Sequence, residues 1–141
     1  MASPKVMAHA PVELDWVSGS QFQAGRPGDP GIRIDGDSQT APSPFDVFLA
    51  SIAACSATDV VAILSKQRTP AQALRVRVEA QRVETVPRRL ASAVLHFSIS
   101  APGATSQKVA RAVELSITKY CSVRSSLASD VPVTWTIDLK D

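Results

Sequence analysis

Two cysteines, Cys55 and Cys121, carry the most reactive side chains of this chain. A thiolate attacks peroxides and disulfides, and the sulfenic acid formed on one cysteine condenses with a second thiol to give a disulfide. Because the cytoplasm keeps most thiols reduced, two cysteines there are more typical of redox chemistry than of a permanent cross-link. The alternative is that both are inert thiols that pack as small apolar side chains.

The reactivity of Cys55 depends on the charges that surround it. Cys55 follows the predicted helix cap Ser43 by twelve residues, so the helix dipole, which fades within the first turn, does not lower its pKa. Asp59 lies one helical turn further on and is expected to raise the pKa of the thiol. A reactive Cys55 therefore needs an arginine beside it, and Arg26 and Arg124 are the candidates.

The composition of the chain indicates its cellular compartment and the classes of partner to expect. Residues 1–10 contain one lysine and no continuous apolar run, so they do not resemble a secretory signal and we expect a cytoplasmic protein. Fifteen basic and thirteen acidic residues are scattered along the chain, which makes nucleic acid an unexpected partner. With 141 residues and 45% apolar content, the chain can bury a core of its own, and we expect a single domain over residues 1–141.

A long helix is predicted around Cys55. Ser43 is its cap, Pro44 its first residue and Asp46 the acid of a capping box. No glycine or proline interrupts the following residues, so the helix is expected to extend to about Gln67.

Strands are predicted on both sides of this helix, because apolar and polar residues alternate there. A second helix, capped by Ser106, is expected to end at Cys121, and Trp16 and Trp135 are expected in the cores of sheets. The fold class is α+β, with antiparallel sheets packed on the long central helix and the second helix. The predicted strands are residues 12–17, 21–24, 31–34, 74–81, 91–99 and 131–139.

The long helix is apolar around its whole circumference, and such a helix must be buried on all sides. One sheet of a small monomer covers a single face, so a second copy of the chain is expected on the other, in a homodimer. A membrane span is the rival interpretation, but Asp46 and Asp59 interrupt the apolar run and a charge within a span is costly. We therefore expect no membrane.

Two segments of the sequence resemble motifs of the OsmC/Ohr superfamily. Residues 43–61 are similar to the central-helix motif, in which a proline and an apolar helix lead to Ala-Ala-Cys, here Cys55. Residues 119–123 resemble the second motif around Cys121. The order of strands and helices resembles the superfamily over nearly the whole chain. The resemblance implies an OsmC-like, intertwined homodimer with two sites at its interface.

The resemblance also implies a chemistry. Cys55 would be the peroxidatic cysteine that reduces an organic hydroperoxide, and Cys121 the resolving cysteine that closes a disulfide. An arginine in a Gly-Arg-x-Gly loop holds the peroxidatic thiolate in the family, and Arg26 occupies the matching position. The reductant would be an external dithiol such as a lipoyl group, with no bound cofactor and no metal.

The sequence departs from the better-known branches at two places. Phe45 stands where a glutamate holds the arginine, and Asp46, one residue later, is expected on the helix face opposite Cys55. Ser122 stands where those branches carry proline. Asp46, Asp59 and Arg124 are therefore only supporting candidates. A non-enzymatic redox sensor, a hydrophobic-ligand carrier and a structural dimer with inert thiols remain alternatives to the peroxidase.

Overall fold

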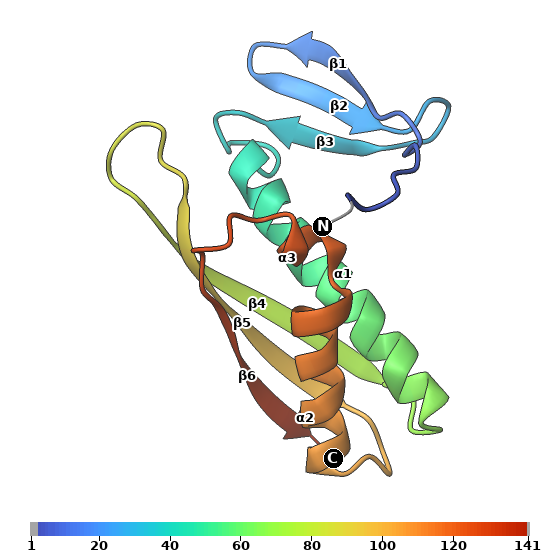
Figure 1. Ribbon diagram of the computed structural model, residues 1–141. Coiled ribbons are helices and arrows are strands. Elements are labelled where there is room, and N and C mark those ends of the chain that lie inside the picture. Colours follow the sequence, from blue (N-terminus) through green and yellow to red (C-terminus); the bar gives the residue numbers. More distant parts are fainter. Residues whose placement is uncertain (1–2, 141) are drawn as a thin grey trace. The chain divides into compact units, whose positions relative to one another are not determined.

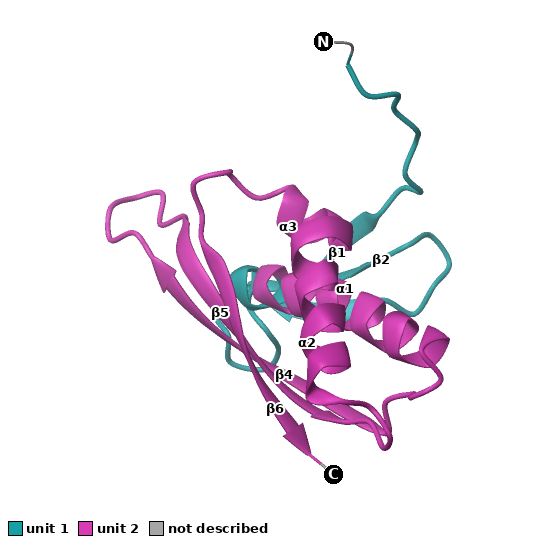
Figure 2. Cartoon of the chain, turned by 60° about the horizontal axis from the view of Figure 1, so that its bottom comes forward, with its two compact units in different colours: residues 1–47 teal, residues 48–141 magenta. Residues whose placement is uncertain are grey.

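The computed structural model describes residues 3–140, which form two compact units, one up to Val47 and one from Phe48 onward (Figure 2). The expected single domain over residues 1–141 stays a prediction. The expected α+β class is confirmed: each unit contains a sheet, and the helices form separate segments between groups of strands (Figure 1).

The first unit holds an antiparallel sheet in the order β1-β2-β3. Its strands are β1 (Glu13–Ser18), β2 (Gln21–Gly25) and β3 (Ile32–Asp35). Gly19 has a φ of +54° and turns the chain between β1 and β2, a conformation that favours glycine. The expected place of Trp16 in a sheet core is wrong, because its side chain is 68% exposed and its indole N–H donates to the carbonyl of Gly19.

Asp35 organises the loop that leads from β3 into the long helix. Its buried carboxylate accepts hydrogen bonds from the hydroxyls of Ser20 and Thr40 and from the backbone N–H groups of Asp37, Gln39 and Thr40. These donors hold the pKa of Asp35 well below its ordinary value, the N–H of Asp37 contributing most. Sequence reasoning treated this segment only as a polar loop.

The long helix α1 spans Pro44–Lys66, close to the expected bounds. The predicted capping box is confirmed: the N–H of Asp46 donates to the Ser43 hydroxyl at 3.0 Å, and the N–H of Ser43 donates to the Asp46 carboxylate at 2.9 Å. By length and composition α1 could cross a membrane, so the expected absence of a membrane stays a prediction.

The second unit contains a mixed sheet in the order β4-β5-β6. Its strands are β4 (Ala73–Arg82), β5 (Leu90–Ser100) and β6 (Val133–Lys140). The β4–β5 hairpin is antiparallel as expected, but β6 runs parallel to β5, which corrects the purely antiparallel expectation. The reason is the helical segment between β5 and β6. It carries the chain back to the end of the sheet at which β5 begins, so that β6 starts there and runs in the same direction.

That crossover consists of three short segments. They are α2 (Ser106–Leu115), the π-helical segment η1 (Ser116–Tyr120) and α3 (Ser122–Ser125). The N-cap of α2 is Thr105, whose hydroxyl accepts from the N–H of Lys108; the expected cap Ser106 is the first helical residue instead. Both α1 and α2 lie on the same face of the β4-β5-β6 sheet (Figures 1 and 2).

The core of the second unit lies between this sheet face and the helices. Alternate residues of β5, among them Leu95, Phe97 and Ile99, are fully buried. Within the chain only one stripe of α1 is fully covered, as expected for a helix that packs on a single sheet, and burial of its other face by a second copy stays a prediction. That stripe is Ile52, Ser56, Val60 and Leu64.

Candidate active site

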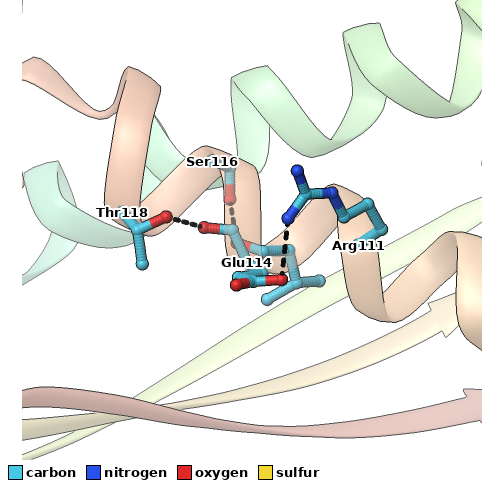
Figure 3. Close-up of polar contacts among 5 residues, drawn as sticks. Arg111, Glu114, Ser116 and Thr118 are labelled. Atoms are coloured by element: carbon cyan, nitrogen blue, oxygen red, sulfur yellow. Dashed lines mark hydrogen bonds and ion pairs between the residues drawn. The ribbon is translucent and has the colours of Figure 1, made fainter.

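A change of helical pitch precedes Cys121. In η1 the N–H of Cys121 donates to the carbonyl of Ser116, five residues back, at 2.7 Å. The Ser116 hydroxyl donates to the carbonyl of Val113 at 2.8 Å, and the Thr118 hydroxyl donates to the carbonyl of Glu114 at 2.7 Å. Figure 3 shows the Thr118–Glu114 bond beside Ser116. Single π turns are common at functional sites because they change the direction of the residues that follow. Here the π turn ends at Cys121, which becomes the N-cap of α3.

The structure brings the two predicted cysteines together. Cys55 lies in the middle of α1 and Cys121 between η1 and α3, near enough that each thiol influences the pKa of the other. Both are free thiols, Cys55 partly exposed and Cys121 with 2% of its surface exposed. The pair therefore consists of a partly exposed thiol, Cys55, and a buried one, Cys121.

The pKa of Cys55 is lowered from its ordinary value. Burial raises this pKa, but hydrogen bonds from the Val123 N–H, the Cys121 side chain and the hydroxyl and N–H of Ser122 together outweigh it. The Ser122 Oγ lies 3.8 Å from the Cys55 Sγ. The pKa of Cys55 is lowered in spite of the rise that Asp59 was expected to cause, because the first turn of α3 supplies donors that favour the thiolate.

The pKa of Cys121 moves in the opposite direction. Burial raises it, and the neighbouring Cys55 raises it further. Two donors oppose this rise: the N–H of Arg124 lies 3.3 Å from the Cys121 Sγ, and the Ser56 hydroxyl lies 3.6 Å from it. The Ser56 hydroxyl is also 2.9 Å from the Ile52 carbonyl, so its single proton serves one acceptor at a time. Cys121 stays a neutral thiol at a pH at which Cys55 is already ionising.

The remaining predicted residues have other surroundings. Arg124 touches Cys121 through its backbone, while its guanidinium donates to the carbonyl of Val131 at 3.2 Å. Within residues 3–140 the Asp59 carboxylate makes no hydrogen bond or ion pair. Asp46 belongs to the capping box of α1. Arg26 lies in the first unit, on the turn between β2 and β3, and its role beside Cys55 stays a prediction.

A pocket of about 430 Å³ adjoins Cys121 on the second unit. Arg124 and Lys119 contribute its positive charges, and Trp135 and Val133 of β6 contribute apolar surface. Among residues 3–140 no three His, Cys, Asp or Glu side chains gather closely enough to hold a metal ion.

A family model matches most of the chain. The family model described as OsmC-like protein matches residues 35–136, a range that includes α1, both cysteines and all three strands of the second sheet up to residue 136. The chain belongs to the OsmC-like family. Arg26 lies outside the matched range.

Relatives of this OsmC-like chain include a protein of similar sequence and two solved structures of similar fold. Protein YhfA of Escherichia coli is 38% identical over 122 residues, which cover 86% of this chain and 91% of YhfA. The crystal structure of an OsmC-like protein from Mycoplasma pneumoniae has a TM-score of 0.81 at 14% identity, covering 96% of this chain and 100% of that one. The organic hydroperoxide resistance protein OhrB of Bacillus subtilis has a TM-score of 0.61 at 16% identity, covering 94% and 98%. The two structural likenesses show a common fold.

Sequence reasoning missed the donors that this OsmC-like chain presents to Cys55. They are the hydroxyl and N–H of Ser122 and the N–H of Val123. One signal was available, since Ser122 was seen to replace the proline of better-known branches. A serine there adds a hydroxyl donor and an N–H, and proline has neither.

Proposed function

We propose that the protein is a thiol-dependent peroxidase that reduces organic hydroperoxides in oxidative-stress defence. One observation carries the proposal: the free thiols of Cys55 and Cys121 are neighbours, and the pKa of the partly exposed Cys55 is lowered while the pKa of the buried Cys121 is raised. Membership of the OsmC-like family supports it, as does the likeness of fold to a protein named for organic hydroperoxide resistance.

The reaction divides between the two sulfurs. The Cys55 thiolate attacks the terminal oxygen of the hydroperoxide, the O–O bond breaks, and the alkoxide takes up a proton and leaves as an alcohol. The sulfenic acid on Cys55 then meets the Cys121 thiol, and a disulfide forms with release of water. The lowered pKa of Cys55 suits it for the first step, and the position of Cys121 beside it suits the second.

An external dithiol, such as a lipoyl group, completes the proposed cycle. One thiolate of the reductant attacks the protein disulfide, and its second thiol releases the reduced protein, so that the reductant leaves as a disulfide. Cys55 is the better leaving group because its pKa is the lower of the two. Arg26 is proposed to hydrogen-bond the peroxide oxygen that becomes negatively charged.

We also propose a cytoplasmic homodimer. Outside its buried stripe, α1 presents apolar side chains that the chain only partly covers, including Phe48, Leu49 and Val61, the last 46% exposed. Apolar surface on a helix of this kind is stable in water only when a partner covers it. A second copy, lying on this face, fits the expectation from the sequence.

A redox sensor is the second candidate function. The observation that favours it is the role of Asp46, whose carboxylate serves the helix cap. Within residues 3–140 the Arg26 guanidinium makes no ion pair, so the acidic partner seen in the better-known branches is absent there. A sensor needs the disulfide but not rapid turnover.

The test is consumption of cumene hydroperoxide by the purified protein with dihydrolipoamide as the reductant. We expect turnover by the parent and none by Cys55→Ser. Cys121→Ser, the matched control, is expected to consume one equivalent and to leave a sulfenic acid on Cys55 that dimedone labels. Undiminished turnover by Cys55→Ser would refute the proposal. A disulfide formed without turnover with any dithiol would favour the sensor.

A further inference from the structure

The outer face of the β4-β5-β6 sheet carries a polar cluster that the proposed peroxidase does not use. This face is turned away from the buried apolar residues of β5, because neighbouring residues of a strand point to opposite sides. Arg75 pairs with Ser98 and Arg77 pairs with His96 across the antiparallel β4–β5 ladder. The four side chains therefore stand at the corners of a rectangle of about 5 by 7 Å.

Glu79 and Thr136 hold one side of this cluster in place. The Glu79 carboxylate lies 3.5 Å from the Arg77 guanidinium and 3.4 Å from the His96 Nε2. The His96 Nδ1 lies 2.7 Å from the hydroxyl of Thr136 on β6. Both imidazole nitrogens are thus engaged, and Arg77 is anchored through one nitrogen with its other donors available.

Arg75 differs from Arg77 in its surroundings. Within the described part of the chain its guanidinium makes no hydrogen bond or ion pair. The nearby Asp138, opposite Ser98 on β6, is paired with Lys140 at 3.4 Å. Two guanidinium groups therefore face a single carboxylate, Glu79, and the cluster has an excess of positive charge.

A hollow of about 330 Å³ lies over the cluster and is lined by Arg75, Arg77, Glu79, His96 and Ser98. We propose that this hollow is a binding site for the phosphate group of a small molecule. Arg75 and Arg77 donate to the phosphate oxygens, Ser98 donates from the neighbouring strand, and His96, held by Glu79 and Thr136, forms the far wall.

The chemistry of the donors suits a phosphate group. Planar guanidinium groups bind phosphate oxygens through paired N–H donors, and two of them two residues apart on one strand can share a tetrahedral anion. The hollow is polar and open, so it recognises the charged end of a ligand and leaves an organic remainder to extend over the sheet. Free phosphate and a phosphate ester share this chemistry.

The experiment is an NMR titration of the full-length, ¹⁵N-labelled protein at fixed ionic strength, with inorganic phosphate in one arm and glycerol 3-phosphate in the other. We expect saturable changes in amide chemical shift that are confined to β4 and β5, with a Kd of about 1 mM. Stronger binding of the ester than of phosphate would identify an esterified ligand, and equal binding would identify free phosphate; both support the site.

Two variants and a control make the result specific. Arg75→Gln, which removes a guanidinium that makes no hydrogen bond or ion pair within residues 3–140, is expected to weaken binding. Arg75→Gln with Arg77→Gln is expected to weaken it by at least about tenfold. Arg111→Gln, on α2, where Arg111 pairs with Glu114 at 3.1 Å (Figure 3), is expected to bind as the parent does. Absence of saturable shifts in both arms, or equal binding by the double variant, would overturn the proposal.

Discussion

The hydroxyl oxygen of Ser122 lies 3.8 Å from the sulfur of Cys55, although 67 residues separate them in the chain. Ser122 is the first residue of α3, whose N-cap is Cys121. One short segment thus supplies both the second sulfur and the donors that favour a thiolate on the first. The segment that carries Cys121 thus also lowers the pKa of Cys55.

Replacing Ser122 by alanine is expected to raise the pKa of Cys55. The hydroxyl is one of the groups that lower this pKa, so without it a smaller fraction of Cys55 is thiolate at any pH below the pKa. Iodoacetamide labelling of Cys55, followed by mass spectrometry from pH 5 to 10, should show a midpoint shifted to higher pH by roughly half a unit to one unit.

The matched control for that change is Ser125→Ala. Ser125 is exposed on the same short helix, and its side chain makes no hydrogen bond within residues 3–140. Its labelling profile should coincide with that of the parent. A Ser122→Ala profile that also coincides with the parent would show that the hydroxyl does not stabilise the thiolate.

Replacing Arg26 by glutamine distinguishes two possible roles of this arginine: stabilising the Cys55 thiolate, and stabilising the negative charge that develops on the peroxide. Ser122, Val123 and Cys121 lower the pKa of Cys55, so the labelling profile of Cys55 should stay unchanged. If Arg26 stabilises the developing charge on the peroxide, consumption of cumene hydroperoxide should fall about 10²-fold. Arg33→Gln, in β3 of the same sheet, serves as the control and should keep the parent rate. An unchanged peroxide rate in Arg26→Gln would remove Arg26 from the mechanism.

Replacing Val61 by aspartate tests the proposed dimer. Val61 is a large apolar side chain exposed on α1, and a charge buried at an interface costs roughly 3 kcal/mol or more. Light scattering after size exclusion should give twice the chain mass of 15.0 kDa for the parent and the single mass for Val61→Asp. Val86→Asp, the same change at a residue 83% exposed between β4 and β5, should remain dimeric. A monomeric parent would contradict the dimer outright.

Asp35 makes the stability of the first unit depend on pH. Its folded pKa lies below its ordinary value of 3.8, so its contribution is complete at neutral pH and is lost as the pH falls from about 4 towards the folded pKa. Asp35→Asn should unfold at lower urea concentration than the parent at pH 7, and the difference should shrink at pH 3. Trp16 fluorescence reports this unit, and Asp15→Asn, an exposed acid of β1, should leave the midpoint unchanged. Equal midpoints for Asp35→Asn and the parent at pH 7 would show that the carboxylate contributes nothing.

Patterns close together in the sequence predicted the local structure well. The bounds of α1 follow from Ser43, Pro44 and Asp46 at its start, because a capping box is made within four consecutive residues. The alternation that predicted β4 and β5 reports the two faces of one strand. The parallel pairing of β6 was missed because alternation carries no information about strand direction. The helix predicted before β6 did carry that information, since a helical crossover usually joins parallel strands.

The sequence by itself determined the fold class, the family motifs and the two sulfurs able to react, since these depend on residue types and short spacings. Only the tertiary structure decided how the sulfurs differ. The π turn before Cys121 places that thiol in the interior, and the backbone N–H of Val123 reaches Cys55 across the packing of α3 on α1. Every residue but proline has a backbone N–H. Which of these groups donates to Cys55 therefore depends on the tertiary fold and not on the type of residue.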